Sequence, residues 1–268
     1  MKQTFKRIMD AFGLREACWD MALYHRIMWD DPARERHRAT LDFYRRFTEE
    51  NQLGGGLWFD VGANVGGKSA IFLEFCGPLV AIEPDPENVA ILNRRLRFAS
   101  RTAIEASAVG VQVGMAKLIV AGAYSTLSVK EATLLQQEGG FMGGKLSSQP
   151  TTVTVPVTTL DALIAKHGTP VFVKIDVEGY EAEVLAGLTR PVRMICFESN
   201  LPAFEEEAVK CVTRFASLAP AEFNYTTEEP PRQFAAERWL NLEAMIGLLR
   251  SRTFGYAEVY GRTTIARS

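Results

Sequence analysis

LWFDVGANVGGKS, residues 57–69, is the stretch that decides the fold. A short apolar run ends at Asp60, a turn rich in glycine follows, and the residues after the turn can begin a helix. Glycine allows the backbone conformations that tight turns need, and turns of this kind bind nucleotide groups in α/β proteins. We therefore expect a nucleotide-containing cofactor to bind at this turn.

Two different chemistries fit the turn. The letters DVGANVG at residues 60–66 resemble the loop that binds S-adenosylmethionine (SAM), whereas GANVGGKS at residues 62–69 matches the P-loop pattern. Asp60, immediately before the turn, would repel a triphosphate, but a carboxylate suits the ammonium and sulfonium groups of SAM. The charge therefore favours SAM. A P-loop NTPase or nucleotide switch that depends on Lys68 stays open as an alternative.

The composition indicates a globular protein without a strong preference for charged partners. Of its 268 residues 47% are hydrophobic, and the formal net charge is −2. This charge gives no electrostatic reason to expect nucleic acid or an anionic membrane as a partner. The four cysteines form no CxxC pair, and no run of 18 apolar residues suggests a transmembrane segment. We expect a cytoplasmic protein with reduced thiols and a small-molecule partner.

The chain divides into an amino-terminal part and an α/β domain. Residues 1–52 combine charged and aromatic side chains at helical spacing, which predicts a helical cap. From residue 53 to 268, short apolar runs alternate with amphipathic stretches, which is typical of a doubly wound α/β sheet. The glycine-rich residues 121–158 are predicted to form a lid or substrate loop. The predicted strands, seven in number, lie near residues 57–61, 79–83, 103–109, 171–176, 192–198, 221–226 and 255–262.

Acidic residues stand at the ends of four of these strands, at Asp60, Glu83, Asp176 and Glu198. A doubly wound sheet binds its ligands outside the carboxyl ends of its strands, so these four side chains are candidates for function. The distance along the chain from Gly62 to Glu83 is the one that brings an acid to the ribose of a nucleoside bound at the first turn. This spacing alone does not distinguish SAM from a dinucleotide.

Three motifs taken together resemble the FkbM family of SAM-dependent methyltransferases. They are DVGANVG at residues 60–66, EPDPEN at 83–88 and KIDVEGYEAEVLAG at 174–187. The resemblance covers the chain from about residue 40 to its end. It implies a Rossmann-like class I methyltransferase fold with a final antiparallel strand, and methyl transfer to a hydroxyl of a sugar, polyketide or other natural product. An N-methyltransferase and a SAM-binding module without turnover stay open as alternatives.

The resemblance also implies which residues bind SAM. Those near its methionine end are Asp60, Gly62, Ala63, Asn64 and Gly66, with Glu83 at the ribose, Pro84, Asp85 and Asn88 on the adenosine side, and Ser107 and Ala108 near the adenine. Many class I enzymes place an acid at the third strand end, where this chain has Ser107 and Ala108. The recognition of the adenine amino group is therefore open.

Catalysis by this family would need a base, because an alcohol is a poor nucleophile unless its proton is removed as it attacks. Of the three histidines, His25 and His37 lie in the amino-terminal part, and His167 lies in a turn at the other edge of the sheet. Carboxylates are therefore the better candidates. We predict Asp176 as the general base. Lys174, two residues earlier and so on the same side of the strand, would keep it ionised or contact the substrate.

Glu178 and Glu198 are further catalytic candidates beside Asp176. Glu178 has an alternative role as a cap of the helix that begins near Tyr180, because a negative charge suits a helix N-terminus. Carboxylates are also the ligands that Mg²⁺ prefers, so Asp176, Glu178 and Glu198 are the metal candidates if Mg²⁺ is used. A structural ion-pair network stays open for the same residues. The sequence is compatible with a homo-oligomer.

Overall fold

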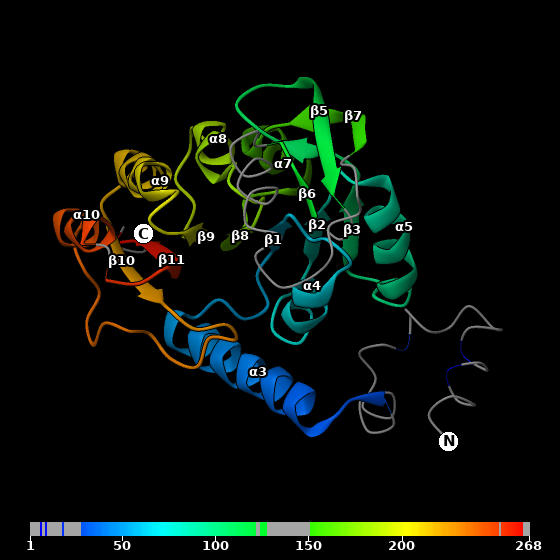
Figure 1. The fold of residues 1–268 in the computed structure, drawn as a ribbon, viewed down its shortest axis with the longest axis horizontal. Coiled ribbons are helices and arrows are strands. Elements are labelled where there is room, and N and C mark those ends of the chain that lie inside the picture. Colours follow the sequence, from blue (N-terminus) through cyan, green and yellow to red (C-terminus); the bar gives the residue numbers. More distant parts are fainter. Residues whose placement is uncertain are drawn as a thin grey trace.

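A seven-stranded sheet lies at the centre of the computed structural model, which describes residues 28–121, 124–127, 151–251 and 253–264 together with Lys6, Met9 and Cys18 (Figure 1). Its strand order is β10-β11-β9-β8-β1-β2-β3. The strands are β1 (Trp58–Val61), β2 (Leu79–Ile82), β3 (Thr102–Glu105), β8 (Phe172–Ile175), β9 (Met194–Asn200), β10 (Ala221–Thr226) and β11 (Tyr256–Thr263). β11 pairs antiparallel with both β9 and β10, and the other pairs are parallel. The prediction of a doubly wound sheet with a final antiparallel strand is confirmed.

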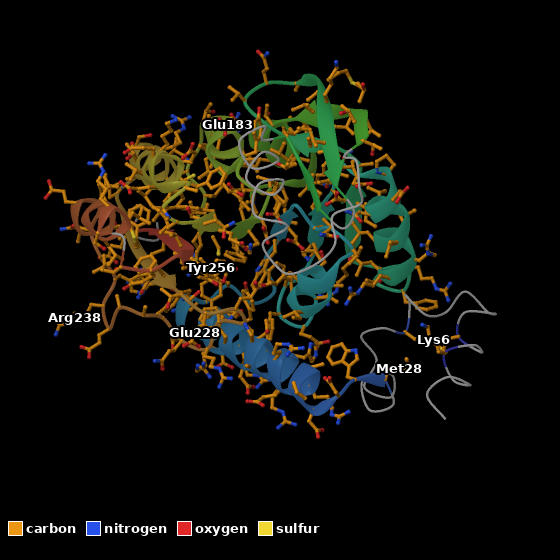
Figure 2. The ribbon with its side chains drawn as sticks, in the orientation of Figure 1. Lys6, Met28, Glu183, Glu228, Arg238 and Tyr256 are labelled. Carbon is orange, nitrogen blue, oxygen red and sulfur yellow. The ribbon has the colours of Figure 1, made fainter. Side chains whose placement is uncertain are left out.

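Helices cover both faces of this sheet, which explains why its central strands are mostly apolar. On one face lie α3 (Asp31–Asn51), α4 (Gly67–Phe72) and α5 (Pro86–Arg95). On the other face lie α7 (Leu160–His167), α8 (Glu181–Ala186), α9 (Glu205–Leu218) and α10 (Leu242–Arg250). Every residue of β1, β2 and β8 is buried. Figure 2 draws the side chains that fill these layers.

α3 packs on the sheet through an aromatic cluster. Phe47 lies with its ring centroid 5.2 Å from that of Phe172 on β8 and 5.3 Å from that of Tyr260 on β11. Asp30 caps the helix by accepting a hydrogen bond from Ala33 N at 2.9 Å. The helical prediction therefore holds for residues 31–51. Most of residues 1–27 lie outside the described residues, and the division at residue 52 stays a prediction.

A second, four-stranded sheet corrects two predictions. The strand predicted at 103–109 is split, because the backbone turns after β3, where Ser107 N donates to Glu105 O at 3.0 Å. Residues 108 and 109 form β4 in the second sheet, whose order is β4-β7-β5-β6. Its other strands are β5 (Gly114–Ala121), β6 (Tyr124–Thr126) and β7 (Thr151–Thr158).

The predicted loop at residues 121–158 is wrong at both of its ends. Residues 124–126 form β6, and 151–158 form β7, which pairs antiparallel with β5 along seven residues of each strand. The signal for β7 was the run of β-branched threonines and valines in TTVTVPVT, because β-branched residues favour strands. Residues 122–123 and 128–150 lie outside the described residues, so a lid there stays a prediction.

Two general expectations concern membranes and thiols. Across the described parts of the chain, no helix is both long and apolar enough to cross a membrane. Cys18, Cys76, Cys196 and Cys211 are all free, and the last three are buried. Thiols buried in an apolar interior behave as small hydrophobic residues.

The packing of α3 predicts a large cost for Phe47→Ala. Phe47 is buried, and removing its ring leaves a cavity between α3, β8 and β11, so the free energy of unfolding should fall by about 3–5 kcal/mol. Urea unfolding followed by circular dichroism measures this change. Glu49→Ala, at an exposed position of the same helix, is the control and should change stability by less than about 0.5 kcal/mol. A small effect of Phe47→Ala would mean that α3 is not part of the folded core.

Candidate functional site

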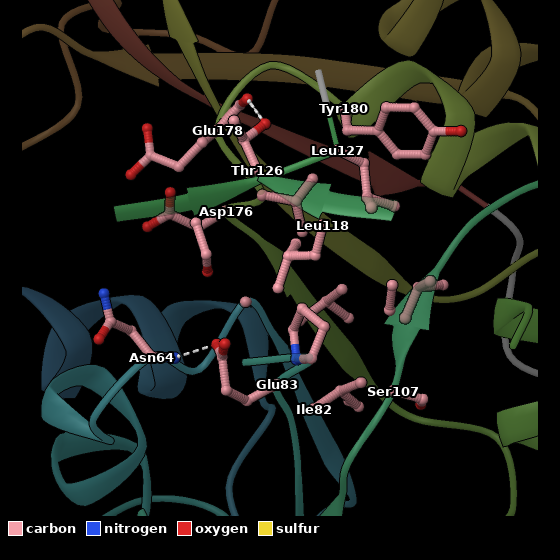
Figure 3. A pocket seen from close by; sticks show the side chains of 17 residues that line it. Asn64, Ile82, Glu83, Ser107, Leu118, Thr126, Leu127, Asp176, Glu178 and Tyr180 are labelled. Carbon is pink, nitrogen blue, oxygen red and sulfur yellow. Dashed lines mark hydrogen bonds between the residues drawn. The ribbon is translucent and has the colours of Figure 1, made fainter. Parts of the chain in front are cut away.

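A cavity of about 640 Å³ lies at the carboxyl ends of β1, β2 and β8. β1 lies between β2 and β8, so the strand order reverses at this point, where doubly wound sheets bind ligands. Gly62, Asn64 and Glu83 line the cavity from the first two strand ends, and Thr126 and Leu127 from the second sheet. In Figure 3, Asp176 and Glu178 lie at one end of the cavity and Ser107 at the opposite end. Some of the predicted cofactor and catalytic residues thus meet at one hollow, and others lie outside it.

The backbone N–H groups of residues 62–66 in the glycine-rich turn all have partners within the protein. Gly62 N and Ala63 N both donate to Ile82 O, at 2.9 and 3.0 Å. Asn64 N donates to Glu83 Oε2 at 2.8 Å. The remaining two hydrogen bonds run from Val65 N to Asn64 Oδ1 and from Gly66 N to Ala63 O, at 2.7 and 2.8 Å. A P-loop needs such amides free to surround phosphates, so this turn is not a phosphate cradle.

The side chains of the P-loop pattern have other partners as well. Lys68 Nζ lies 3.8 Å from Glu258 Oε1 and 4.0 Å from Glu229 Oε1. Ser69 Oγ donates to Asp60 Oδ2, which ties the start of α4 to the end of β1. The bonded amides of residues 62–66 and the ion pairs of Lys68 therefore disfavour the P-loop alternative.

Gly62 is required by a close approach of two strand ends. Its φ of 84° is in the left-handed region, and a Cβ atom at this position would lie 1.7 Å from Asp176 O. Asp176 N in turn donates to Val61 O at 2.9 Å. Only glycine allows the turn after β1 to touch the end of β8.

The carboxylate of Glu83 connects parts of the cavity wall by accepting hydrogen bonds. Oε2 accepts from Asn64 N at 2.8 Å, Oε1 accepts from Asp85 N at 2.9 Å, and the Asn88 side chain also bonds to this carboxylate. Burial raises the pKa of Glu83, while these hydrogen bonds oppose the shift. Each oxygen keeps lone pairs for further donors.

Ser107 presents a buried hydroxyl without a partner. It lines the cavity at the end remote from Asp176, beside Ala108. Ser107 Oγ has no hydrogen-bond partner among the described residues. Buried polar atoms are normally satisfied, so an orphan hydroxyl in a cavity wall marks a place where a ligand can bind. Pro84 also lines the cavity, as predicted from the second motif.

The remaining predicted cofactor residues lie behind the cavity wall. Asp60 is buried, and its pKa is raised by burial to about 6, with the Ser69 hydrogen bond opposing this. Gly66 is the N-cap of α4. Asp85 caps α5 by accepting from Glu87 N at 2.9 Å. None of them, nor Ala63 or Asn88, is part of the cavity lining. Direct contact of these residues with a ligand stays a prediction.

Asp176 and Lys174 form the predicted pair. Lys174 Nζ lies 3.1 Å from Asp176 Oδ2 and 3.6 Å from Glu258 Oε1. The Asp176 side chain is 27% exposed and lines the cavity, whereas Lys174 is 1% exposed and does not. Burial disfavours the charge on Lys174, but Asp176 and Glu258 outweigh it and hold the pKa of Lys174 well above its usual value. Lys174 therefore acts on Asp176 and does not reach the cavity.

Glu258 and Glu181 were missed by the sequence analysis. Glu258 lies within YAEVY, a strand sequence that is otherwise apolar. An acid in such a strand indicates a buried charge, which needs a partner. Glu181 Oε1 accepts from Val177 N at 3.0 Å and Gly179 N at 3.3 Å, and so fixes the loop after β8. Its pKa is raised to about 7 by burial.

The capping role predicted for Glu178 is wrong. The N-cap of α8 is Tyr180, and no side chain caps the helix there. Glu178 has a φ of 55°, and its carbonyl accepts a hydrogen bond from Thr126 Oγ1 at 2.7 Å (Figure 3). This hydrogen bond ties the second sheet to the loop after β8, so both sides of the cavity are held in place.

Glu198 lies beside the main cavity. With Asp176 and Glu178 it lines a neighbouring hollow of about 220 Å³. Burial and then the charges of Asp176 and Glu178 raise its pKa to about 9, against the opposing effect of Lys174. The raised pKa favours the protonated form of Glu198, which is not the form in which a carboxyl group acts as a base.

The magnesium site left open by the sequence is not formed. Among the described residues, no three His, Cys, Asp or Glu side chains are grouped so that they could hold a metal ion. Asp176, Glu178 and Glu198 are thus close without forming such a group.

The histidines lie away from the cavity lining or outside the described residues. His167 Nε2 lies 2.6 Å from Glu105 Oε1, His37 packs against Trp29, and His25 lies outside the described residues.

Comparisons with known proteins identify the family of the chain. The family model of the methyltransferase FkbM domain matches residues 60–244. A search of curated proteins found no match. A solved FkbM methyltransferase from Methylobacillus flagellatus KT has 16% sequence identity and a TM-score of 0.47, and the match covers 77% of this chain and 43% of that one. The chain thus spans less than half the length of that protein.

Two further structures resemble the chain at low identity. A precorrin-6y C5,15-methyltransferase from Geobacter metallireducens GS-15 has 11% identity and a TM-score of 0.43, with 85% of this chain and 86% of that chain covered. A precorrin 8w decarboxylase from Methanobacterium thermoautotrophicum has 11% identity and a TM-score of 0.39, with 82% and 88% covered.

The contact of Gly62 with Asp176 predicts that Gly62→Ala is strongly destabilising. The added methyl group meets a backbone carbonyl in a left-handed conformation, so the free energy of unfolding should fall by at least about 2 kcal/mol. Gly67→Ala is the matched control, because a Cβ there meets only the far end of Arg95 at 3.9 Å and the φ is ordinary. Urea unfolding of both variants measures the two stability losses. Equal effects would contradict the close approach.

The raised pKa of Glu198 predicts a pH-dependent effect of Glu198→Gln. Unfolded Glu198 loses its proton near pH 4.5, but the folded protein holds it until about pH 9, so the wild type loses stability between these values. Glutamine does not titrate. Its stability advantage over the wild type should therefore grow from pH 4.5 to pH 9, by at most about 1.4 kcal/mol per pH unit.

Urea unfolding of the wild type and Glu198→Gln across this pH range measures the difference. Glu243→Gln, which removes an exposed carboxylate from α10, is the control and should follow the wild type at every pH. Parallel curves for Glu198→Gln and the wild type would show that Glu198 is not held protonated.

Proposed function

Because this chain belongs to the FkbM family of methyltransferases, we propose that it transfers the methyl group of SAM to a hydroxyl oxygen of a sugar, polyketide or other natural product. The observation that carries the proposal is the cavity at the point where the strand order reverses, with Glu83 on its wall and Asp176 at one end. When bound, SAM supplies an electrophilic methyl group attached to a positively charged sulfur. The chain's own residues bind the cofactor, orient the acceptor and take its proton.

The residues of the cavity fit the parts of SAM. Glu83 uses one lone pair of each oxygen for a backbone amide and can accept the ribose hydroxyls with those that remain. Ser107 Oγ, which has no partner among the described residues, would bond to the adenine. Gly62 and Asn64 line the part nearest Asp176, where the methionine end would lie. Asp60 supports the turn from behind through Ser69.

Asp176 is the group proposed to remove the acceptor proton. It lines both the main cavity and the neighbouring hollow, so an acceptor in that hollow reaches it. Lys174 Nζ, 3.1 Å away, forms an ion pair with this carboxylate and holds it at the end of the cavity. Glu198, protonated at neutral pH, would donate a hydrogen bond to an acceptor oxygen. Residues 1–52 and 121–158 are proposed to select the acceptor for the methyltransferase domain at 53–268.

Titration calorimetry with SAM, S-adenosylhomocysteine and Mg·ATP tests the cofactor first. Binding of SAM and S-adenosylhomocysteine without Mg·ATP supports the proposal, and binding of Mg·ATP alone contradicts it. Transfer of labelled methyl groups to hydroxylated sugars and polyketides, with matched amines alongside, then tests the acceptor. Methylation of the amines alone would make the protein an N-methyltransferase, and SAM binding without any transfer would make it a binding module.

The orphan hydroxyl predicts that Ser107→Ala weakens SAM binding without damaging the fold. The hydroxyl has no partner to lose in the free protein, so stability should hold, while loss of one hydrogen bond should raise the Kd for SAM about three- to tenfold. Calorimetry and urea unfolding measure the two effects. Thr102→Val is the matched control, since Thr102 Oγ1 is also buried without a partner among the described residues but does not line the cavity. Equal SAM affinity in both variants would remove Ser107 from the site.

A further inference from the structure

Lys68 is a prominent residue of the glycine-rich motif for which methyl transfer has no direct use. It stands in the first turn of α4, and its side chain is 24% exposed. Nζ lies 3.8 Å from Glu258 Oε1, on the last strand of the sheet. Lys68 does not line the cavity, so any role in the site must pass through other residues.

The same oxygen of Glu258 also faces Lys174. Glu258 Oε1 lies 3.6 Å from Lys174 Nζ, and both side chains are 1% exposed. Lys174 Nζ lies 3.1 Å from Asp176 Oδ2. The charges therefore alternate from Lys68 through Glu258 and Lys174 to Asp176, which alone of the four lines the cavity. We call these four residues the charge chain.

The surroundings of the charge chain hold Glu258 in one place. Tyr260 OH donates to Glu258 Oε2 at 2.7 Å, whereas Oε1 has no hydrogen-bond partner among the described residues and faces the two lysines as an ion pair. Glu198 is the residue directly opposite Glu258 in the pairing of β11 with β9. Glu229 lies 4.0 Å from Lys68 at the outer end. Burial opposes the charge on Glu258, but both lysines outweigh it and keep its pKa below the usual value.

When one buried charge interacts with two partners, the loss of either partner changes its interaction with the other. Without Lys68, Glu258 has Lys174 as its single cation at short range and draws it away from Asp176. Without Glu258, Lys174 is committed to Asp176 and the chain carries an excess positive charge. In a low-dielectric interior such imbalances act over several ångströms.

We propose that Glu258, clamped between Lys68 and Lys174, is a positioning residue that sets how far Lys174 neutralises Asp176 at the end of the cavity. The role depends on the methyl transfer proposed above. Lys68 has the same positioning role, which it exerts through Glu258. Glu258 lies beyond residues 60–244, the part of the chain that the family model matches.

The test compares the affinities of SAM and S-adenosylhomocysteine, because they differ by a methyl group and one positive charge. The ratio of their Kd values reports the charge at the cavity and cancels general damage that affects both ligands alike. In Lys68→Met, Asp176 is less neutralised, so the ratio should shift in favour of SAM. In Glu258→Gln it should shift in favour of S-adenosylhomocysteine. Each shift should be about three- to tenfold.

Three controls sharpen the comparison. The double variant Lys68→Met/Glu258→Gln removes one charge of each sign and should return the ratio to within about twofold of the wild type. Lys68→Arg keeps the charge and should do the same. Lys166→Met removes a lysine that is 63% exposed and paired with Glu105, so its ratio should stay at the wild-type value.

The role of Glu258 would be overturned if the Kd ratio shifted in the same direction in both single variants. It would also be overturned if the ratio shifted by less than about twofold. If Glu258→Gln does not fold, Lys68→Met against Lys68→Arg decides, and equal ratios in these two overturn it. A wild type that binds neither ligand sinks the proposed function and the positioning role together. Wild-type binding with unshifted ratios sinks the positioning role alone.

Discussion

The contact between the turn after β1 and the end of β8 is the constraint on which the site depends. Gly62 lies so close to Asp176 O that no side chain fits between them. This approach brings Asp176 to the same cavity as Asn64 and Glu83, although more than 90 residues separate them in the sequence. Because the amides of the turn are already bonded within the protein, the turn is a rigid wall and its selectivity comes from side chains.

The parts of the fold that follow from local patterns were predictable from the sequence. The central strands β1, β2 and β8 of the main sheet were located because buried parallel strands are mostly apolar runs. The second sheet was missed because β4 and β6 have only two and three residues, too few to show a period, and β7 lay in a region read as a loop. The pair of Lys174 and Asp176 was predictable because both residues lie at the end of a predicted strand. Residues two apart point to the same side of a strand.

Roles that depend on three-dimensional neighbours were not predictable. Nothing in the letters around Lys68 shows that its partner is Glu258, almost 200 residues later. Asp60 and Asp85 matched motif positions, but their carboxylates serve Ser69 and the start of α5. A motif specifies which residue types surround a turn, whereas pairing across the sheet decides which of them face the ligand.

β11 is the last strand in the sequence, yet it lies between β9 and β10, which are made before it. It also carries Tyr260, which packs against Phe47 of α3, and Glu258, which balances two buried lysines. β9 and β10 are not paired with each other, so β10 joins the sheet only through residues 256–263. The fold closes only when residues 256–263 emerge, so a ribosome-bound chain that lacks them cannot reach the native state.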